Sequence, residues 1–181
     1  FSLYIGYIKY LILFMICLLI HEIGHILFIK IFNVKILGFN LSIYGCNLKL
    51  EEKQYNSLKK IFKFLIYIGG ILFNLITILI LKSINNFDIK NLLINMNMLL
   101  LIFNLLPIYP LDGYNILFLI INNKNIINNL TILTIVILLI ISIYSNSLGL
   151  IIITLILFYK NIIYYKNKDK QYLLNLFKNM V

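Results

Sequence analysis

The chain has 181 residues, of which 62% are hydrophobic and only 12% charged, and its formal net charge is +10. A soluble domain of this size cannot bury so much apolar surface, so the composition excludes an ordinary soluble domain and indicates a protein surrounded largely by lipid. All sixteen basic residues are lysines at the edges of apolar runs. Without arginine or a basic groove, this pattern favours loop charges that set membrane topology, and it predicts no nucleic-acid partner.

Five apolar segments follow one another along the chain. They cover residues 7–32, 64–81, 92–106, 130–144 and 148–165. The first has about 26 residues, which is enough to cross a bilayer core of about 30 Å at 1.5 Å per residue. The sequence therefore predicts an all-α polytopic membrane protein with about five transmembrane helices.

A short β-hairpin is expected directly after the first helix. Residues 34–50 alternate locally between apolar and polar side chains around Gly45, Cys46 and Asn47. Alternation on both sides of a glycine-containing turn is typical of a hairpin. The polar residues 51–60 are expected at the membrane interface.

The C-terminal end of the chain has a different composition from the rest. We divide the chain into a membrane domain over residues 1–165 and a basic tail over residues 166–181. In the tail, apolar side chains share one helical face: Leu173, Leu176, Phe177 and Met180. This spacing fits an amphipathic helix lying on the membrane surface, and it fits ordinary packing against the bundle equally well.

The lysines are divided unequally between the two sides of the membrane. If residues 7–32 run from outside to inside, thirteen of the sixteen lysines fall on the side of the C-terminus. The other three are Lys9, Lys82 and Lys90. The positive-inside rule therefore predicts a multi-pass protein with a cytosolic C-terminus.

Ionisable side chains at membrane depth belong to two short motifs. The first is "HEIGH", with His21, Glu22 and His25, and the second is "NLLPIYPLDG", which ends at Asp112 and a glycine. These motifs hold both histidines of the chain and the only two acids at membrane depth. A charge at the bilayer centre costs at least about 2.5–3.5 kcal/mol, so such residues usually have a partner and a function.

The first motif has the spacing of a metal site. On a helix, His21 and His25 lie on one face and can bind the same ion. Glu22 follows His21 about 100° around the helix, where it can act as general base on a zinc-bound water. The alternative is a pair of hydrogen-bonded histidines in a buried helix, which the complete His-Glu-x-x-His pattern makes the weaker interpretation.

A catalytic zinc site usually has three protein ligands and an open position for water. Asp112 is the remaining candidate, because Pro107 and Pro110 interrupt the helix before it. Irregular backbone at membrane depth is tolerated only where it is buried in protein or lines a wet cavity. Taken alone, the segment also fits a helix-ending turn; beside "HEIGH", the third-ligand interpretation is favoured.

Two asparagines add polar groups to the apolar interior. Asn74 ends "GGILFN", whose glycines permit close helix approach, and Asn104 begins the aspartate motif. Either can hold the substrate backbone or stabilise an oxyanion, and either can equally form an interhelical hydrogen bond.

The three motifs, in this order, resemble the site-2 proteases, a family of intramembrane zinc metalloproteases. "HEIGH" matches the family's His-Glu-x-x-His helix, "GGILFN" its Gly-x-x-x-Asn segment, and "NLLPIYPLDG" its Asn-x-x-Pro…Leu-Asp-Gly motif. About ninety residues separate His21 from Asp112, as in the family. Within it, "GYIKYLILFMICLLIHEIGH" and "LSIYGCNLKLEE" resemble the sporulation branch, that of stage IV sporulation protein FB.

By this resemblance, His21, His25 and Asp112 bind one Zn²⁺ and Glu22 activates the attacking water. The resemblance implies an intramembrane metalloendopeptidase that cuts a membrane-tethered protein near the cytosolic face, namely a sporulation sigma-factor precursor. The membrane would then be the bacterial cell membrane or the forespore outer membrane. Full-length relatives have six transmembrane helices, and here one upstream helix is absent or lies before Phe1. An inhibitory membrane partner is left open.

The sequence departs from the family pattern after the aspartate motif. Tyr114 and Asn115 stand where the family has a second glycine and a basic residue, and Ile71 stands where proline is common. The roles of those positions do not carry over.

Two other functions stay open. A general site-2 protease would process anti-sigma factors or signal-peptide remnants. A membrane metal transporter also keeps histidines and acids in the bilayer, but it would need ligands on several helices along a path.

Overall fold

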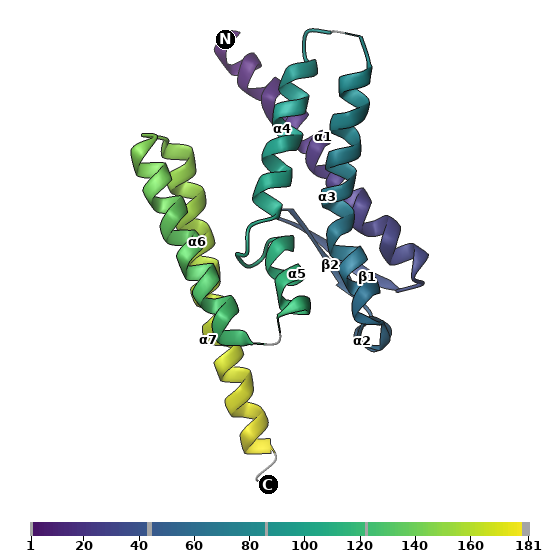
Figure 1. Ribbon diagram of the computed structural model, residues 1–181, viewed down its shortest axis with the longest axis vertical. Helices are drawn as coiled ribbons and strands as arrows, with labels where there is room; N and C mark the ends of the chain where they lie inside the picture. Colours follow the sequence, from purple (N-terminus) through teal and green to yellow (C-terminus); the bar gives the residue numbers. More distant parts are fainter. Residues whose placement is uncertain (1, 43–44, 86, 122, 179–181) are drawn as a thin grey trace. The chain divides into compact units, whose positions relative to one another are not determined.

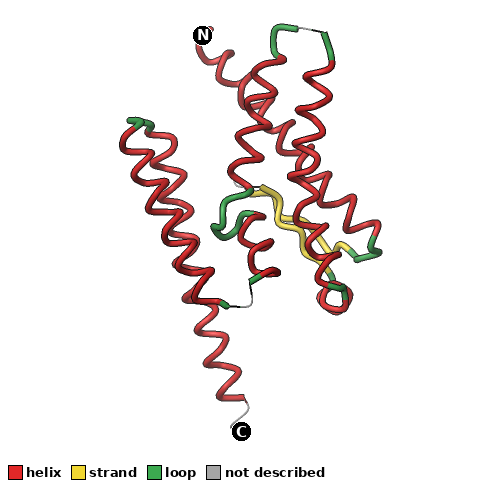
Figure 2. Tube along the Cα trace, in the orientation of Figure 1, coloured by secondary structure: helices red, strands yellow, loops and turns green. Residues whose placement is uncertain are grey.

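The computed structural model describes residues 2–42, 45–85, 87–121 and 123–178. The chain divides into two compact units, Phe1–Leu105 and Leu106–Val181. Helices predominate throughout, and the one sheet of the described residues has two strands (Figure 1, Figure 2). The predicted helical class with a hairpin after the first helix is confirmed.

The first unit is a group of helices around a small hairpin. Its elements are α1 (Ser2–Ile31), β1 (Ile36–Ser42), β2 (Gly45–Leu50), α2 (Glu52–Ser57), α3 (Lys60–Ser83) and α4 (Lys90–Asn104). Helix α1 packs most extensively against α3, and α3 packs in turn against α4. A core of Ile29, Val34 and Ile66 joins the end of α1 to α3, with side chains of the hairpin packed against it.

The hairpin begins where α1 ends. Asn33 takes a left-handed conformation with φ of 54°, and the amide of Val34 donates to the Ile29 carbonyl at 3.0 Å. This arrangement stops a helix and satisfies one of its last carbonyl groups. The strands pair antiparallel from Ile36 opposite Leu50 to Ser42 opposite Gly45.

The predicted position of the turn was wrong by about two residues. Residues 45–47 belong to β2, and the two residues that connect the strands, 43 and 44, lie outside the described part of the chain. Glycine marked the turn only approximately because a strand also tolerates it.

The second unit contains α5 (Asp112–Ile120), α6 (Lys124–Tyr144) and α7 (Leu148–Lys178). Helices α6 and α7 pack against each other, and α5 contacts α6. Their core consists of Ile135, Leu157 and Ile108, the last from the irregular segment before α5. Helix α7 runs without a break from an apolar segment into the predicted tail, whose side chains from 168 onward lie outside the described residues.

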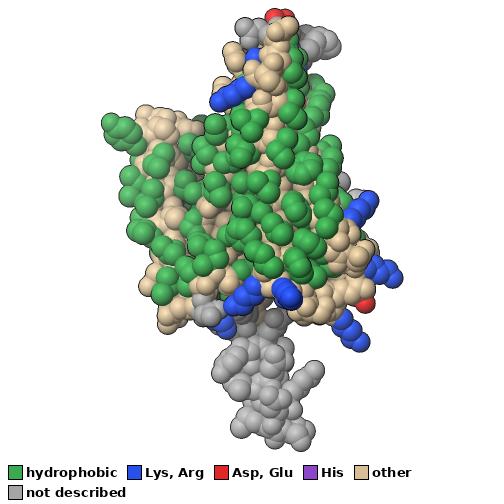
Figure 3. All heavy atoms as spheres, turned by 45° about the vertical axis from the view of Figure 1, so that its right-hand side comes forward, with side chains coloured by type: hydrophobic (Ala, Val, Ile, Leu, Met, Phe, Trp, Pro, Cys, Tyr) green, Lys and Arg blue, Asp and Glu red, His purple; other side chains and the backbone are tan. Residues whose placement is uncertain are grey.

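Four of the described helices are long and apolar enough to cross a membrane: Ile8–Ile31, Lys60–Ser83, Lys124–Tyr144 and Leu148–Asn167. Helix α4, which corresponds to the apolar segment predicted over residues 92–106, has 15 residues and is about 22 Å long, which falls short of a core of about 30 Å. Large hydrophobic side chains are exposed on all four spans, and Figure 3 shows such side chains covering most of one face. The protein is therefore a multi-pass membrane protein.

Candidate metal centre

The two histidines lie on the face of α1 that packs against α3. The buried residues of α1 follow a helical spacing: Cys17, His21, Gly24, His25 and Ile29. His21 and His25 are 3% and 8% exposed, so both imidazoles are removed from solvent and lipid. Buried polar groups of this kind need hydrogen-bond partners.

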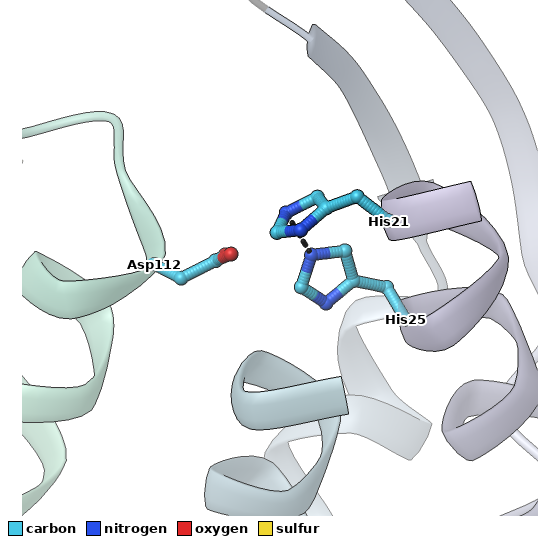
Figure 4. A group of neighbouring side chains, drawn as sticks. All are labelled: His21, His25 and Asp112. Carbon is cyan, nitrogen blue, oxygen red and sulfur yellow. Dashed lines mark hydrogen bonds between the residues drawn. The ribbon is translucent and has the colours of Figure 1, made fainter. Parts of the chain in front are cut away.

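The two imidazole rings face each other through their Nε2 atoms. Nε2 of His21 lies 3.1 Å from Nε2 of His25, and the ring planes are nearly perpendicular at 82° (Figure 4). On the far side, Nδ1 of His25 donates to the Ile66 carbonyl of α3 at 2.8 Å. Because a carbonyl only accepts, this bond puts the proton of a neutral His25 on Nδ1 and leaves a lone pair on Nε2.

Glycines bring α1 and α3 into backbone contact beside the histidines. A Cβ built on Gly24 would overlap the Gly69 carbonyl, and a Cβ on Gly69 would lie 2.7 Å from the Gly24 carbonyl oxygen. Neither backbone can move aside as a flexible side chain would. The close approach is therefore possible only because both positions are glycine.

Gly70 leaves open the space beneath the rings. A Cβ at this position would lie 2.5 Å from Nε2 of His25 and 2.7 Å from Nε2 of His21. The missing side chain thus clears a cradle at the two nitrogens that face each other. The sequence motif predicted close helix packing at this glycine pair, and it gave no sign that one of the two lies against the Nε2 atoms of both histidines.

These residues fit a zinc ion. Two nitrogens bound to one tetrahedral zinc at 2.0–2.1 Å are about 3.3–3.4 Å apart, close to the 3.1 Å between the two Nε2 atoms. Zinc prefers imidazole nitrogen, and a ligating histidine normally donates its other ring N–H to an oxygen, as His25 does to Ile66. The cradle at Gly70 supplies the room.

The other predicted site residues of the first unit, Glu22, Asn74 and Asn104, differ in their position and in their contacts. Glu22 follows His21 on α1 and is half-buried. Asn74 is fully buried on α3, and its Nδ2 lies 3.1 Å from Nδ1 of His21. Asn104 is the last residue of α4, and its amide donates to the Leu100 carbonyl of its own helix at 3.0 Å.

Asp112 belongs to the second unit, where it is the first residue of α5. The irregular segment before it is held by α6 and α7. The Thr131 hydroxyl of α6 donates to the Pro107 carbonyl at 2.8 Å, and the Asn161 amide of α7 donates to the Tyr109 carbonyl at 2.9 Å. These bonds satisfy backbone carbonyls that a broken helix leaves open.

Tyr114, one of the departures from the family pattern, has a packing position. It is 3% exposed, and its ring makes edge contacts at 5.8 Å with the rings of Tyr109 and Tyr164. Tyr109 and Tyr164 are themselves stacked at 4.1 Å. The tyrosines thus join α5, the irregular segment and α7.

Thr131 and Asn161 were not singled out from the sequence. The available signal was the same as for Asn74, a polar residue within an apolar helix, but their partners lie 24 and 52 residues away. In a chain this rich in asparagine, composition alone gave no reason to select Asn161.

The three candidate ligands, His21 and His25 in the first unit and Asp112 in the second, are labelled in Figure 4. Two imidazoles and a carboxylate are ligands that zinc takes in hydrolytic enzymes.

Comparisons with known proteins agree on the kind of protein. No protein-family model matches the chain. Among curated proteins, the chain is 32% identical over 58% of its length to YydH of Bacillus subtilis (strain 168), provisionally described as a peptide zinc metalloprotease. The match covers 44% of YydH, so the chain spans less than half of that relative.

Among solved structures, the site-2 protease from Methanocaldococcus jannaschii matches with a TM-score of 0.63 and 26% identity. The match covers 82% of this chain and 73% of that one. These findings confirm the resemblance to the site-2 protease family, and they do not single out its sporulation branch.

Proposed function

We propose that this chain, a relative of the site-2 proteases, is an intramembrane zinc metalloendopeptidase that cleaves a membrane-tethered protein. The observation that carries the proposal is the histidine pair: two buried imidazoles converge over a glycine cradle on a helix long enough to span the bilayer. A buried polar pair of this kind in a membrane helix indicates a functional site.

Asp112 is the proposed third ligand of one zinc ion. The chemistry of the donor set supports this assignment, as does the way that α6 and α7 fix the segment that leads to Asp112. A site of two histidines and one carboxylate leaves a fourth tetrahedral position for water.

Glu22 is the proposed catalytic base. Bound zinc would lower the pKa of its water to about 7 and polarise the scissile carbonyl. The Glu22 carboxylate would take the proton of the attacking water and later deliver it to the leaving amine. Its place beside His21 on α1, half-buried, suits both transfers.

The site is proposed to open toward the cytosol. His25 lies six residues before the end of α1 at Ile31, about 9 Å along the helix, so water has a short path from that membrane face. The lysine distribution supports a cytosolic location for that end and for the C-terminus.

The substrate must present an extended segment, because a helix hides its carbonyl groups. The hairpin of β1 and β2 follows α1 directly and has strand edges to which such a segment can pair. The sporulation sigma-factor precursor stays a prediction that the comparisons do not support. Anti-sigma factors and signal-peptide remnants are the other candidate substrates.

The test uses the full chain in detergent with a panel of membrane-tethered candidate substrates, including a sigma-factor precursor. Cleavage is read by gel shift, and bound zinc is measured in the same samples. Glu22→Gln should keep zinc and lose cleavage by a factor of about 10²–10⁴. Equal cleavage by parent and variant would contradict the proposal, and zinc flux into vesicles by both would favour a transporter instead.

A further inference from the structure

Asn74 is the buried residue of α3 whose side chain contacts the histidine pair. Its Nδ2 lies 3.1 Å from Nδ1 of His21. Its Oδ1 is buried and has no hydrogen-bond partner among the described residues. A buried carbonyl oxygen without a donor destabilises the fold, so this orphaned oxygen calls for an explanation.

The orientation of the Asn74 amide decides where the His21 proton lies. With its NH₂ group toward His21, the amide can only donate, so Nδ1 of His21 accepts from it. The single proton of the neutral ring then lies on Nε2, the nitrogen that faces His25. A ring protonated on Nε2 cannot bind a metal through that atom.

Turning the Asn74 amide over exchanges its oxygen and nitrogen with almost no change of shape. Oδ1 then accepts from Nδ1–H of His21, and Nε2 of His21 keeps its lone pair. His25 already has this arrangement, since its Nδ1 donates to the Ile66 carbonyl at 2.8 Å. Both Nε2 atoms, which lie beside the cradle at Gly70, then keep a lone pair.

We infer that Asn74 is a positioning residue that holds His21 in the metal-binding tautomer, and that its amide turns over when the metal binds. The neutral ring has one proton in both states, so no charge is gained or lost. The inference rests on the proposed function, because it takes the histidines as ligands. Mutating the hydrogen-bond partner of a metal-bound histidine typically lowers metal affinity by about 10–100-fold.

The first experiment measures the dissociation constant of Zn²⁺ for the full chain in detergent by competition with a chromogenic chelator. Asn74→Leu should bind zinc about 10–100-fold more weakly than the parent. Asn74→Asp, whose carboxylate only accepts, should bind at least as tightly as the parent. The matched control is Asn97→Leu, which removes another buried amide of the same unit, one that donates to Leu93 and Cys17, and it should leave affinity unchanged.

The second experiment observes the tautomer directly. The chain has only two histidines, so ¹⁵N-labelled histidine gives two ring systems by NMR. In the zinc-loaded parent both rings should carry the proton on Nδ1, and without zinc the His21 ring should carry it on Nε2. In Asn74→Asp, the His21 proton should stay on Nδ1 with and without zinc.

The outcomes separate this inference from the proposed function. If the parent binds no zinc, the metal site itself is wrong. If the parent binds zinc and Asn74→Leu binds equally well, or if Asn74→Asp loses affinity as Asn74→Leu does, only the role of Asn74 is overturned. An equal loss in Asn97→Leu would also overturn it, because the effect would then be general destabilisation.

Discussion

The two units position their candidate ligands in different ways. In the first, His21 and His25 are one helical turn apart on α1, and the backbone contact between Gly24 and Gly69 sets the helix against α3. In the second, Asp112 follows an irregular segment whose carbonyls are bonded by remote side chains of α6 and α7. The spacing of residues along a helix sets the relative position of two candidate ligands on it. The position of a candidate ligand at a helix break depends instead on residues far away in the sequence.

Among the packing contacts, the largest effect is expected at the cradle of the first unit. In Gly70→Ala, the added methyl would lie 2.5 Å from Nε2 of His25, so at least one ring must move. We expect zinc affinity to fall by about 10–100-fold and the rate of cleavage to fall with it. Equilibrium competition for zinc measures the first, and the substrate gel shift measures the second.

Gly149→Ala is the control for that variant, because a Cβ at Gly149 meets nothing within 4 Å. Gly149→Ala should bind zinc as the parent does. If Gly70→Ala also keeps full zinc affinity, the rings do not depend on the cradle, and the geometric account of the first unit fails.

The next effect concerns the helix crossing itself. In Gly24→Ala, the methyl would overlap the Gly69 carbonyl, so α1 and α3 must separate. Overpacking of this kind typically destabilises by about 1–3 kcal/mol. Thermal unfolding of the detergent-solubilised chain should show a lower midpoint than in Gly149→Ala, and equal midpoints would show that the helices can part freely.

The sequence predicted the first unit more completely than the second. The length and apolar composition of the segments predicted α1 and α3, and the spacing of the His-Glu-x-x-His motif predicted the histidine pair. The glycine pair of residues 69–70 predicted close packing of α3. Each of these follows from local spacing in the sequence. The contacts of Thr131 and Asn161 could not be predicted, because they depend on how helices 24 and 52 residues away return to the segment. The apolar segment predicted over residues 92–106 differs from α4 only at its ends, because the helix begins at Lys90 and ends at Asn104, three residues before Pro107.

A smaller effect is expected from the support of the second unit. Thr131→Val keeps the shape of the side chain but removes the donor to the Pro107 carbonyl, and one such bond contributes about 0.5–1.5 kcal/mol. We expect a modest loss of stability together with reduced cleavage at saturating zinc, because the segment before Asp112 is loosened.

Thr134→Val is the matched control on the same helix. Among the described residues, its hydroxyl bonds only to carbonyls of α6 itself, those of Leu130 and Thr131. Cleavage should be close to that of the parent in Thr134→Val. An equal fall in both variants would mean that the anchoring of the segment has no special role.

Asp112 is the proposed third ligand of the zinc ion, and the dissociation constant of Zn²⁺ for Asp112→Asn tests this role most directly. The control is Asp88→Asn, at an exposed acid before α4. Losing a hydrogen-bond partner of a metal ligand typically weakens metal binding by about 10–100-fold. Asp112→Asn removes a proposed ligand itself, so it should weaken zinc binding by more than that. Asp88→Asn should bind zinc as the parent does. Unchanged affinity in Asp112→Asn would contradict the account, because the two histidines would then hold the ion without the second unit.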